Sequence, residues 1–209
     1  MAEIKGGYEK TYDVLVPRLA GCDFASVCGD LGLEPPQDGV VRIEFLRRPY
    51  EIDATGVRCL TESTRKYVNR KSVLIYYLTS GGRGEPLMQF QMLHAFSQGI
   101  FSGSRGTEWM TSGVCKLFGD SPELFSKTMD VLGARRLEPR PSAHDIWEYW
   151  VLPRVPTEIS YYGADEEFPC EIRVMFDKTA LAYVPFETLA VLDGCLIQEI
   201  NDIGIELTQ

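Results

Sequence analysis

Apolar residues recur at helical spacing, every third or fourth position, over residues 8–19. The continuous apolar run 73–78 fits a buried helix or a strand, and its length with the charged residues before it favours a helix. The ends of two segments carry helix signals. Asp23 stands where it can cap a helix that stops at Gly32. Pro122 opens another helix, which stops at Gly133. The predicted helices span residues 8–19, 24–31, 64–79, 107–118 and 122–132.

Strand patterns appear once early in the chain and then dominate its last third. Val41, Ile43 and Phe45 alternate with charged residues, which indicates a half-buried strand that returns as a hairpin after a turn at 46–49. The last third is rich in Trp, Tyr, Ile and Val, which favour strands. The predicted strands span residues 40–45, 50–53, 87–93, 145–152, 157–162 and 170–176.

The order of these elements predicts the fold class. Helices come early and strands late without regular β-α-β alternation, so we expect an α+β fold. Its antiparallel sheet comes mainly from the C-terminal third, with helices packed over it. A short helix is expected at 186–192, and the tail at 196–207 alternates only weakly. The proline-rich stretch 138–142 is interpreted as a loop, so the prediction is a single domain over 1–209.

Charge and cysteine usage narrow the function classes. The formal net charge is -9, which argues against nucleic acid and against an anionic membrane surface. No apolar run approaches the ~18 residues of a membrane span, and the first eight residues lack the apolar stretch of a secretory signal. The six cysteines show no C-x-x-C spacing, so reduced thiols and a cytoplasmic location are expected.

Three adjacent carboxylates, residues 165–167, lie in a turn between two predicted strands. Alternation places Asp165 and Glu167 on one side, and Asp177 follows the next strand. Together these three form the candidate catalytic set, for acid–base chemistry or for a hard cation. The alternatives are a solvated hairpin tip for the turn and a capping role for Asp177.

The candidate ligand-binding residues come from two segments. Ser104 and Arg105 lie in a glycine-rich loop before a predicted helix, where backbone N–H groups and the helix dipole favour an anion. The alternative is an ordinary helix start. Trp150 and Tyr162 belong to an aromatic set in the last third, on a sheet face that either meets a flat ligand or partner or is covered by helices.

Met88, Met92 and His94 lie within seven positions of one another. Thioether and imidazole groups ligate haem iron and soft metals. The alternative is a methionine-rich core strand, and we assign no metal ligand from the sequence. The glycine-rich loops match neither a Walker motif nor a nucleophile elbow, and no cofactor is indicated.

Short motifs spread along the chain resemble a family of bacterial and archaeal proteins known as domain of unknown function 3786. The motifs are Gly7-Tyr8-Glu9-Lys10, Tyr76-Tyr77-Leu78, Leu152-Pro153, Asp165-Glu166-Glu167-Phe168-Pro169, Phe176-Asp177 and Tyr183-Val184-Pro185. The resemblance implies a protein typical of anaerobes, and some members carry an iron–sulfur cluster domain of four cysteines. This chain lacks that cysteine quartet, so no separate iron–sulfur domain is expected. The family supplies no catalytic residues.

Three functions are consistent with the sequence. The leading hypothesis is a cytoplasmic accessory or ligand-binding module, associated with anaerobic cofactor or iron–sulfur metabolism, whose partner is a small molecule or a redox or cofactor protein. The second hypothesis is an enzyme that uses Asp165, Glu167 and Asp177. The third is a metal or haem carrier that uses Met88, Met92 and His94.

Overall fold

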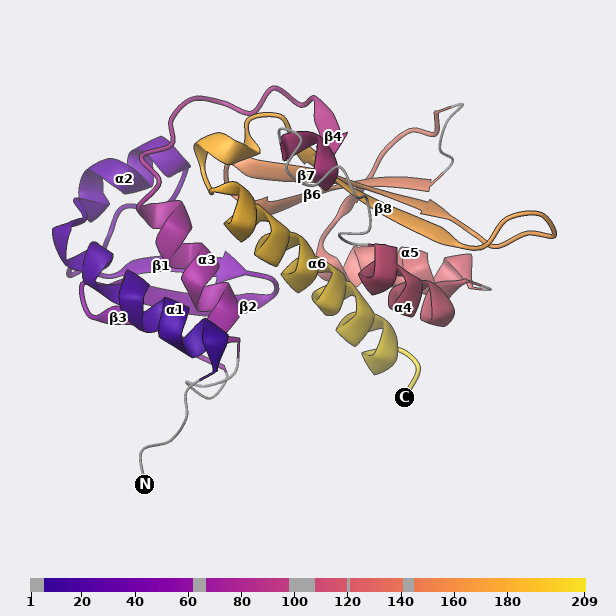
Figure 1. Cartoon of the computed structure of the whole chain (residues 1–209), viewed down its shortest axis with the longest axis horizontal. Coiled ribbons are helices and arrows are strands. Elements are labelled where there is room, and N and C mark those ends of the chain that lie inside the picture. The colour runs from indigo at the N-terminus through magenta and orange to yellow at the C-terminus, as the bar shows by residue number, and fades with distance from the viewer. Residues whose placement is uncertain (1–5, 62–66, 98–107, 120, 141–144) are drawn as a thin grey trace. The chain divides into compact units, whose positions relative to one another are not determined.

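Figure 1 shows the computed structural model of the chain. It describes residues 6–61, 67–97, 108–119, 121–140 and 145–209. The chain forms two compact units, each built from two stretches of sequence: unit 1 takes 1–85 and 180–192, and unit 2 takes 86–179 and 193–209. Both units combine helices with antiparallel strands, so the predicted α+β class is confirmed. Residues 138–140 belong to unit 2, and residues 141 and 142 lie outside the described part of the chain.

Unit 1 places helices beside an antiparallel sheet of order β1-β2-β3 (Figure 1). Tyr12 ties α1 to the sheet, because its hydroxyl accepts from Val57 N at 2.9 Å and donates to Val57 O at 3.3 Å. Tyr77 ties α3 to the end of α2 by donating to Leu31 O at 3.0 Å. The elements of unit 1 are α1 (Gly7–Leu15), η1 (Val16–Gly21), α2 (Phe24–Leu31), β1 (Val41–Phe45), β2 (Arg48–Asp53), β3 (Gly56–Cys59), α3 (Val68–Leu78) and η3 (Ala180–Ala182).

The helix signals in unit 1 act as predicted. Asp23 caps α2 by accepting from Ser26 N, and Gly32 ends the helix in the left-handed conformation with φ 70°. The predicted helix over 8–19 changes into a 3-10 helix at Val16, next to Pro17, which has no N–H to donate. Strand β3 was not predicted, because four residues after a hairpin turn give too short a pattern.

Unit 2 is built on an antiparallel sheet of order β4-β8-β7-β6-β5. Strands β6, β7 and β8 agree with the predicted strands to within two residues. The strand predicted over 87–93 is reduced to three residues in the structure, because Met88 adopts a left-handed φ of 55° before it and a 3-10 helix begins at Leu93 after it. The elements of unit 2 are β4 (Phe90–Met92), η2 (Leu93–Phe96), α4 (Glu108–Phe118), α5 (Pro122–Leu132), β5 (Arg135–Arg136), β6 (Asp145–Leu152), β7 (Val155–Tyr162) and β8 (Glu171–Asp177).

Helices cover one face of the unit 2 sheet. Phe125 of α5 stacks on Tyr161 of β7 at 4.6 Å between ring centroids and meets Trp147 of β6 edge-on at 5.3 Å. The Tyr161 hydroxyl donates to Phe118 O at 2.7 Å, which fixes the end of α4 on the same face. Each of these aromatic side chains is buried, which contributes roughly 1.5–3 kcal/mol relative to exposure. This packing leaves the opposite face of the sheet for polar and methionine side chains.

The last helix corrects the prediction for the tail. Helix α6 runs from Phe186 to Glu206 and passes from unit 1 into unit 2, whereas the sequence pattern indicated a helix over 186–192 only. Asp193 and Glu199 interrupt the apolar pattern, yet both are buried. Buried apolar residues recur along the helix at spacings of three and four: Leu189, Leu192, Leu196, Ile200 and Ile203. Within the described residues, no helix is long and apolar enough to cross a membrane.

Candidate functional site

The face of the unit 2 sheet away from Phe125 carries the candidate site. Strand alternation sends Glu158, Ser160 and Tyr162 of β7 to this face, and the register pairs Glu158 with Met175 and Ser160 with Arg173 of β8. Side chains of this face line a cavity of about 570 Å³, which we call the sheet-face cavity. All of its lining residues belong to unit 2. They divide into two groups by chemistry.

The polar wall of the cavity consists of Arg140, Glu158, Ser160, Tyr162 and Arg173. Arg140 Nη2 lies 2.5 Å from Glu158 Oε1, and this glutamate is only 5% exposed. The Arg173 guanidinium lies over the Tyr162 ring, 4.7 Å from its centroid. This arrangement holds the Tyr162 ring against a cation and keeps its hydroxyl within 3.4 Å of Arg173 Nη1.

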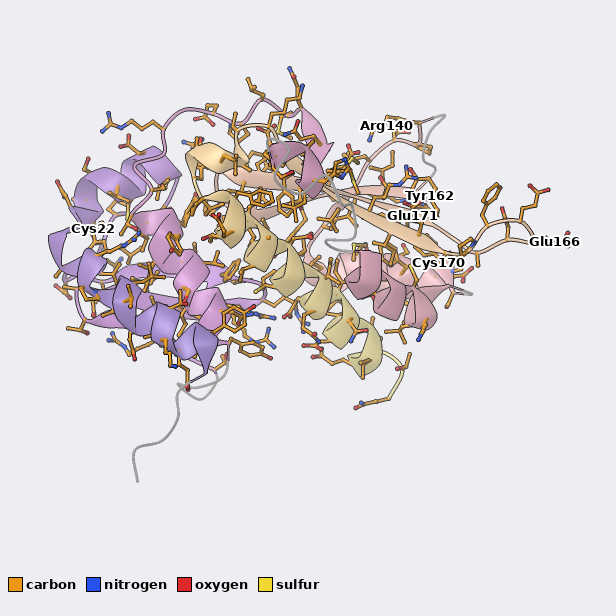
Figure 2. All side chains as sticks on the ribbon, in the orientation of Figure 1. Cys22, Arg140, Tyr162, Glu166, Cys170 and Glu171 are labelled. Carbon is orange, nitrogen blue, oxygen red and sulfur yellow. The ribbon has the colours of Figure 1, made fainter. Side chains whose placement is uncertain are left out.

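The two arginine charges of the polar wall are matched by carboxylates. Arg140 pairs with Glu158, and Arg173 pairs with Glu171 through Nε at 2.7 Å and Nη2 at 2.8 Å. Figure 2 shows Arg140, Tyr162 and Glu171 toward one end of the unit 2 sheet. The formal charges of these two arginines and two glutamates sum to zero. The cavity therefore suits a ligand without a large net charge.

The methionine wall consists of Met88, Phe90, Met92, His94 and Met175. Met92 and Met175 are direct partners across β4 and β8, and both are half-buried. The predicted group of Met88, Met92 and His94 is thus brought together at one cavity, and Met175 joins it from a strand more than eighty residues away in sequence. The alternative of a methionine-rich core strand does not describe these side chains, since none of them is fully buried.

Asp177 shapes the methionine wall through the backbone. Its carboxylate is fully buried and accepts from Leu87 N at 3.2 Å, Gln89 N at 2.9 Å and Thr179 N at 2.9 Å. Burial acts to raise the pKa of Asp177, but the hydrogen bonds from Thr179, Gln89 and Leu87 outweigh it and leave this pKa below its usual value. Leu87 and Gln89 flank Met88, so the carboxylate fixes the backbone on both sides of that residue.

A second buried glutamate lies beside Glu158. Glu148 of β6 is its direct partner across the sheet. Glu148 accepts from Arg135 Nη2 at 3.0 Å and from the Trp150 indole at 3.1 Å. Two carboxylates directly opposite each other repel, so each is balanced by an arginine: Arg135 of the edge strand β5 pairs with Glu148, and Arg140 pairs with Glu158. We interpret these pairs as the charged framework of the polar wall.

The acidic tip, residues Asp165, Glu166 and Glu167, lies in the turn between β7 and β8. Asp165 accepts from Glu167 N at 2.8 Å and from Phe168 N, which is a local turn interaction. All three residues are exposed and none lines the sheet-face cavity. Figure 2 shows Glu166 at the far end of the hairpin. The length of β8, about 20 Å, separates this tip from Asp177, so the structure does not bring the candidate catalytic set together.

The four candidate ligand-binding residues have different outcomes. Ser104 and Arg105 lie outside the described residues. Trp150 is 43% exposed, donates its indole N–H to Glu148 and does not line the cavity. Tyr162 does line the cavity. Sequence reasoning missed Arg140, Glu158, Ser160 and Arg173. The available signal was polar alternation within strands that are otherwise apolar.

The cysteines are scattered over both units. The six residues form no disulfide within the described parts of the chain. Burial raises the pKa of Cys22, Cys28 and Cys115. Raised pKa values leave fewer thiolates, so these thiols are poor nucleophiles near neutral pH. The described residues also contain no cluster of three or more His, Cys, Asp and Glu side chains that would hold a metal ion.

Comparison with known families accounts for most of the chain. Residues 23–199 match the family described as Domain of unknown function (DUF3786). The chain belongs to this family. The resemblance found from the short motifs is therefore confirmed, and the span matched to the DUF3786 domain includes every residue that lines the sheet-face cavity. No curated protein and no solved structure matches this DUF3786 chain.

Proposed function

We propose that the protein is an accessory module that binds a small ligand in the sheet-face cavity of unit 2. One observation carries the proposal: side chains from separate segments, between residues 88 and 175, converge on a single opening of about 570 Å³. Openings of roughly 300–1,000 Å³ with a few placed polar groups are typical of small-molecule sites. Strand register and the Asp177 hydrogen bonds hold these side chains in place.

The two walls of the cavity define the ligand class. Thioether and aromatic groups of the methionine wall favour an apolar or polarisable part of a ligand. The Ser160 and Tyr162 hydroxyls of the polar wall can orient it by hydrogen bonds. Because Arg140 and Arg173 already have carboxylate partners, we expect a ligand with little net charge.

The accessory role and its setting belong to the same proposal. We place the protein in the cytoplasm, because six cysteines without a disulfide in the described residues suit a reducing compartment. A redox or cofactor protein from anaerobic cofactor or iron–sulfur metabolism is the proposed partner. This choice of partner rests on the family resemblance alone. The acid–base alternative gains no support, because its three carboxylates lie apart.

Native mass spectrometry of the protein purified under anaerobic conditions tests the proposal. Ser160→Phe places a ring in the cavity, while Val131→Phe adds the same ring on α5, where Val131 is 44% exposed. We expect the native mass of the wild type and of Val131→Phe to exceed the denatured mass by one ligand, and Ser160→Phe to lose that excess. An apo mass for the wild type, or an excess that survives in Ser160→Phe, contradicts the proposal. A circular dichroism spectrum confirms that both variants are folded.

A further inference from the structure

The methionine wall offers a particular kind of metal-binding chemistry. Thioether sulfur is a soft, uncharged ligand, and imidazole is a common metal ligand when neutral. Soft ligands select Cu(I) among the biological first-row ions, whereas carboxylate and carbonyl oxygen suit harder ions. The cavity is lined by three thioethers and one imidazole, from Met88, Met92, Met175 and His94.

Strand register places two of the sulfurs together. Met92 and Met175 are Cα partners in the antiparallel pair of β4 and β8. The Cβ atoms of such partners lie about 4.5–5.5 Å apart on the same face. Each methionine side chain has three rotatable bonds beyond Cα, so both sulfurs can approach one point above the sheet.

Met88 is held at the cavity by a strained backbone. Its φ of 55° lies in the left-handed region, which a non-glycine residue adopts only at an energetic cost. The buried Asp177 carboxylate fixes this conformation by accepting from Leu87 N and Gln89 N, on either side of Met88. Such strain persists where the surrounding structure enforces it, commonly at ligand sites. At 40% exposure Met88 stays accessible, as a ligand at the cavity mouth must.

We propose that Met88, Met92, Met175 and His94 bind a soft monovalent metal ion, with Cu(I) as the probe. This inference rests on the proposed function and specifies it: the module carries a soft metal ion or a ligand that contains one. Both arginines of the cavity have carboxylate partners, so their charges oppose a monovalent cation only weakly. Thioether sulfur is uncharged, and imidazole ligates a metal in its neutral form.

Methionine methyl resonances provide the test. The protein is labelled with ¹³C at the methionine methyl groups, assigned through single Met→Leu variants, and titrated with Cu(I) under anaerobic conditions. We expect the resonances of Met88, Met92 and Met175 to shift up to one equivalent. Met129 is the matched control, because it is fully buried on α5, and its resonance should not move. Thiols bind Cu(I) more tightly than thioethers, so the accessible cysteines are alkylated before the titration. A methionine shift counts only if it appears in this alkylated protein.

Affinity gives a second readout. Competition with the Cu(I) chelator bicinchoninate measures the affinity for the Cu(I) ion that shifts the methionine resonances. The double variant Met92→Leu/Met175→Leu should bind this ion over about 100-fold more weakly than the wild type. Residues that only support a metal ligand already contribute about 10–100-fold, and this variant removes two ligands. Met129→Leu should match the wild type. His94→Gln should weaken binding while the methionine shifts remain.

The two proposals fail in different ways. If Cu(I) leaves the three resonances unmoved, or shifts Met129 equally, the metal proposal is wrong. The binding module still stands if Ser160→Phe removes a retained ligand in the same preparations. If the wild type retains no ligand and its methionines ignore Cu(I), both proposals are wrong.

Discussion

The acidic tip and the sheet-face cavity differ in how their residues are distributed along the sequence and in space. The tip concentrates three carboxylates in three consecutive residues, yet all of them face solvent. The cavity draws on residues spread from Met88 to Met175, and they converge on one opening. Functional groups that are clustered in the sequence therefore need not lie close together in the folded protein. Consecutive residues in a turn point apart, whereas residues opposite each other across antiparallel strands share a face.

The carboxylates of the two regions sharpen this contrast. At the tip, the carboxylates are exposed and Asp165 accepts hydrogen bonds from the neighbouring backbone N–H groups of Glu167 and Phe168. Asp177 and Glu158 are buried beside the cavity and accept hydrogen bonds or an ion pair from distant segments. A carboxylate that is buried away from water requires such partners. Substituting a buried carboxylate should therefore lower the free energy of unfolding more than substituting a carboxylate of the tip.

The largest effect is expected for Asp193 in α6, a third kind of carboxylate. It is buried, and its Oδ1 meets no hydrogen-bond partner among the described residues; burial raises its pKa to about 7. Between about pH 4 and pH 7 the unfolded chain has released this proton while the native state keeps it. The free energy of unfolding should therefore fall as pH rises through this window, by on the order of 4 kcal/mol.

Urea denaturation of the wild type and of Asp193→Asn across this pH range measures the effect. The variant cannot ionise, so it should lose this part of the pH dependence and become the more stable protein above pH 7. Asp165→Asn, at the exposed tip, is the control and should follow the wild-type profile. Parallel profiles for the wild type and Asp193→Asn would contradict the prediction.

Asp177→Ala should be the next most disruptive change. It leaves the backbone N–H groups of Leu87, Gln89 and Thr179 without their acceptor, at a cost of roughly 3 kcal/mol in the free energy of unfolding. It should also move the Met88 methyl resonance, since Met88 loses its backbone support. Asp165→Ala, which removes an exposed acceptor, should cost less than about 1 kcal/mol. An equal loss of unfolding free energy in the two variants would show that the buried carboxylate is no more important for stability than the exposed one.

The ion pair of the polar wall should be worth more than an exposed pair. Glu158 is 5% and Arg140 51% exposed, whereas Asp53 and Arg58 in unit 1 are 22% and 46% exposed, so the two pairs differ mainly in the burial of the carboxylate. Double-mutant cycles with Glu158→Gln/Arg140→Gln and with Asp53→Asn/Arg58→Gln compare their coupling energies by urea denaturation. We expect about 1–2 kcal/mol for the pair of Glu158 and Arg140 and a smaller coupling energy for the pair of Asp53 and Arg58. The reverse order would show that Glu158 does not depend on Arg140.

The smallest effect is expected at the acidic tip. The triple variant Asp165→Asn/Glu166→Gln/Glu167→Gln removes three exposed charges and keeps the hydrogen-bond acceptor of the turn. Its unfolding free energy should stay within about 0.5 kcal/mol of the wild type. Native mass spectrometry should find the ligand retained as before. Loss of the ligand in this variant would return the functional site to the tip.

Local signals predicted much of the fold. The Asp23 cap, the Gly32 and Gly133 ends and the strand over 145–152 appear where the sequence placed them. The long helix α6 was missed because the buried Asp193 and Glu199 break its apolar pattern. Of the candidate site residues, Tyr162 lines the cavity, and so does the methionine and histidine group. The arginines and glutamates of the polar wall had no motif to mark them.

The sequence by itself determined the periodic elements, because spacing, caps and side-chain alternation act within a few residues of each other. It also determined which side chains share a face of each strand. The tertiary structure decided which strands became neighbours and in which register, and so joined Met92 to Met175 and Arg140 to Glu158. Those pairings depend on hydrogen bonds and packing between segments far apart in the chain. Asp177 has a structural role beside the cavity because it bonds to such a distant segment, whereas the acidic tip bonds within its own turn and stays in solvent.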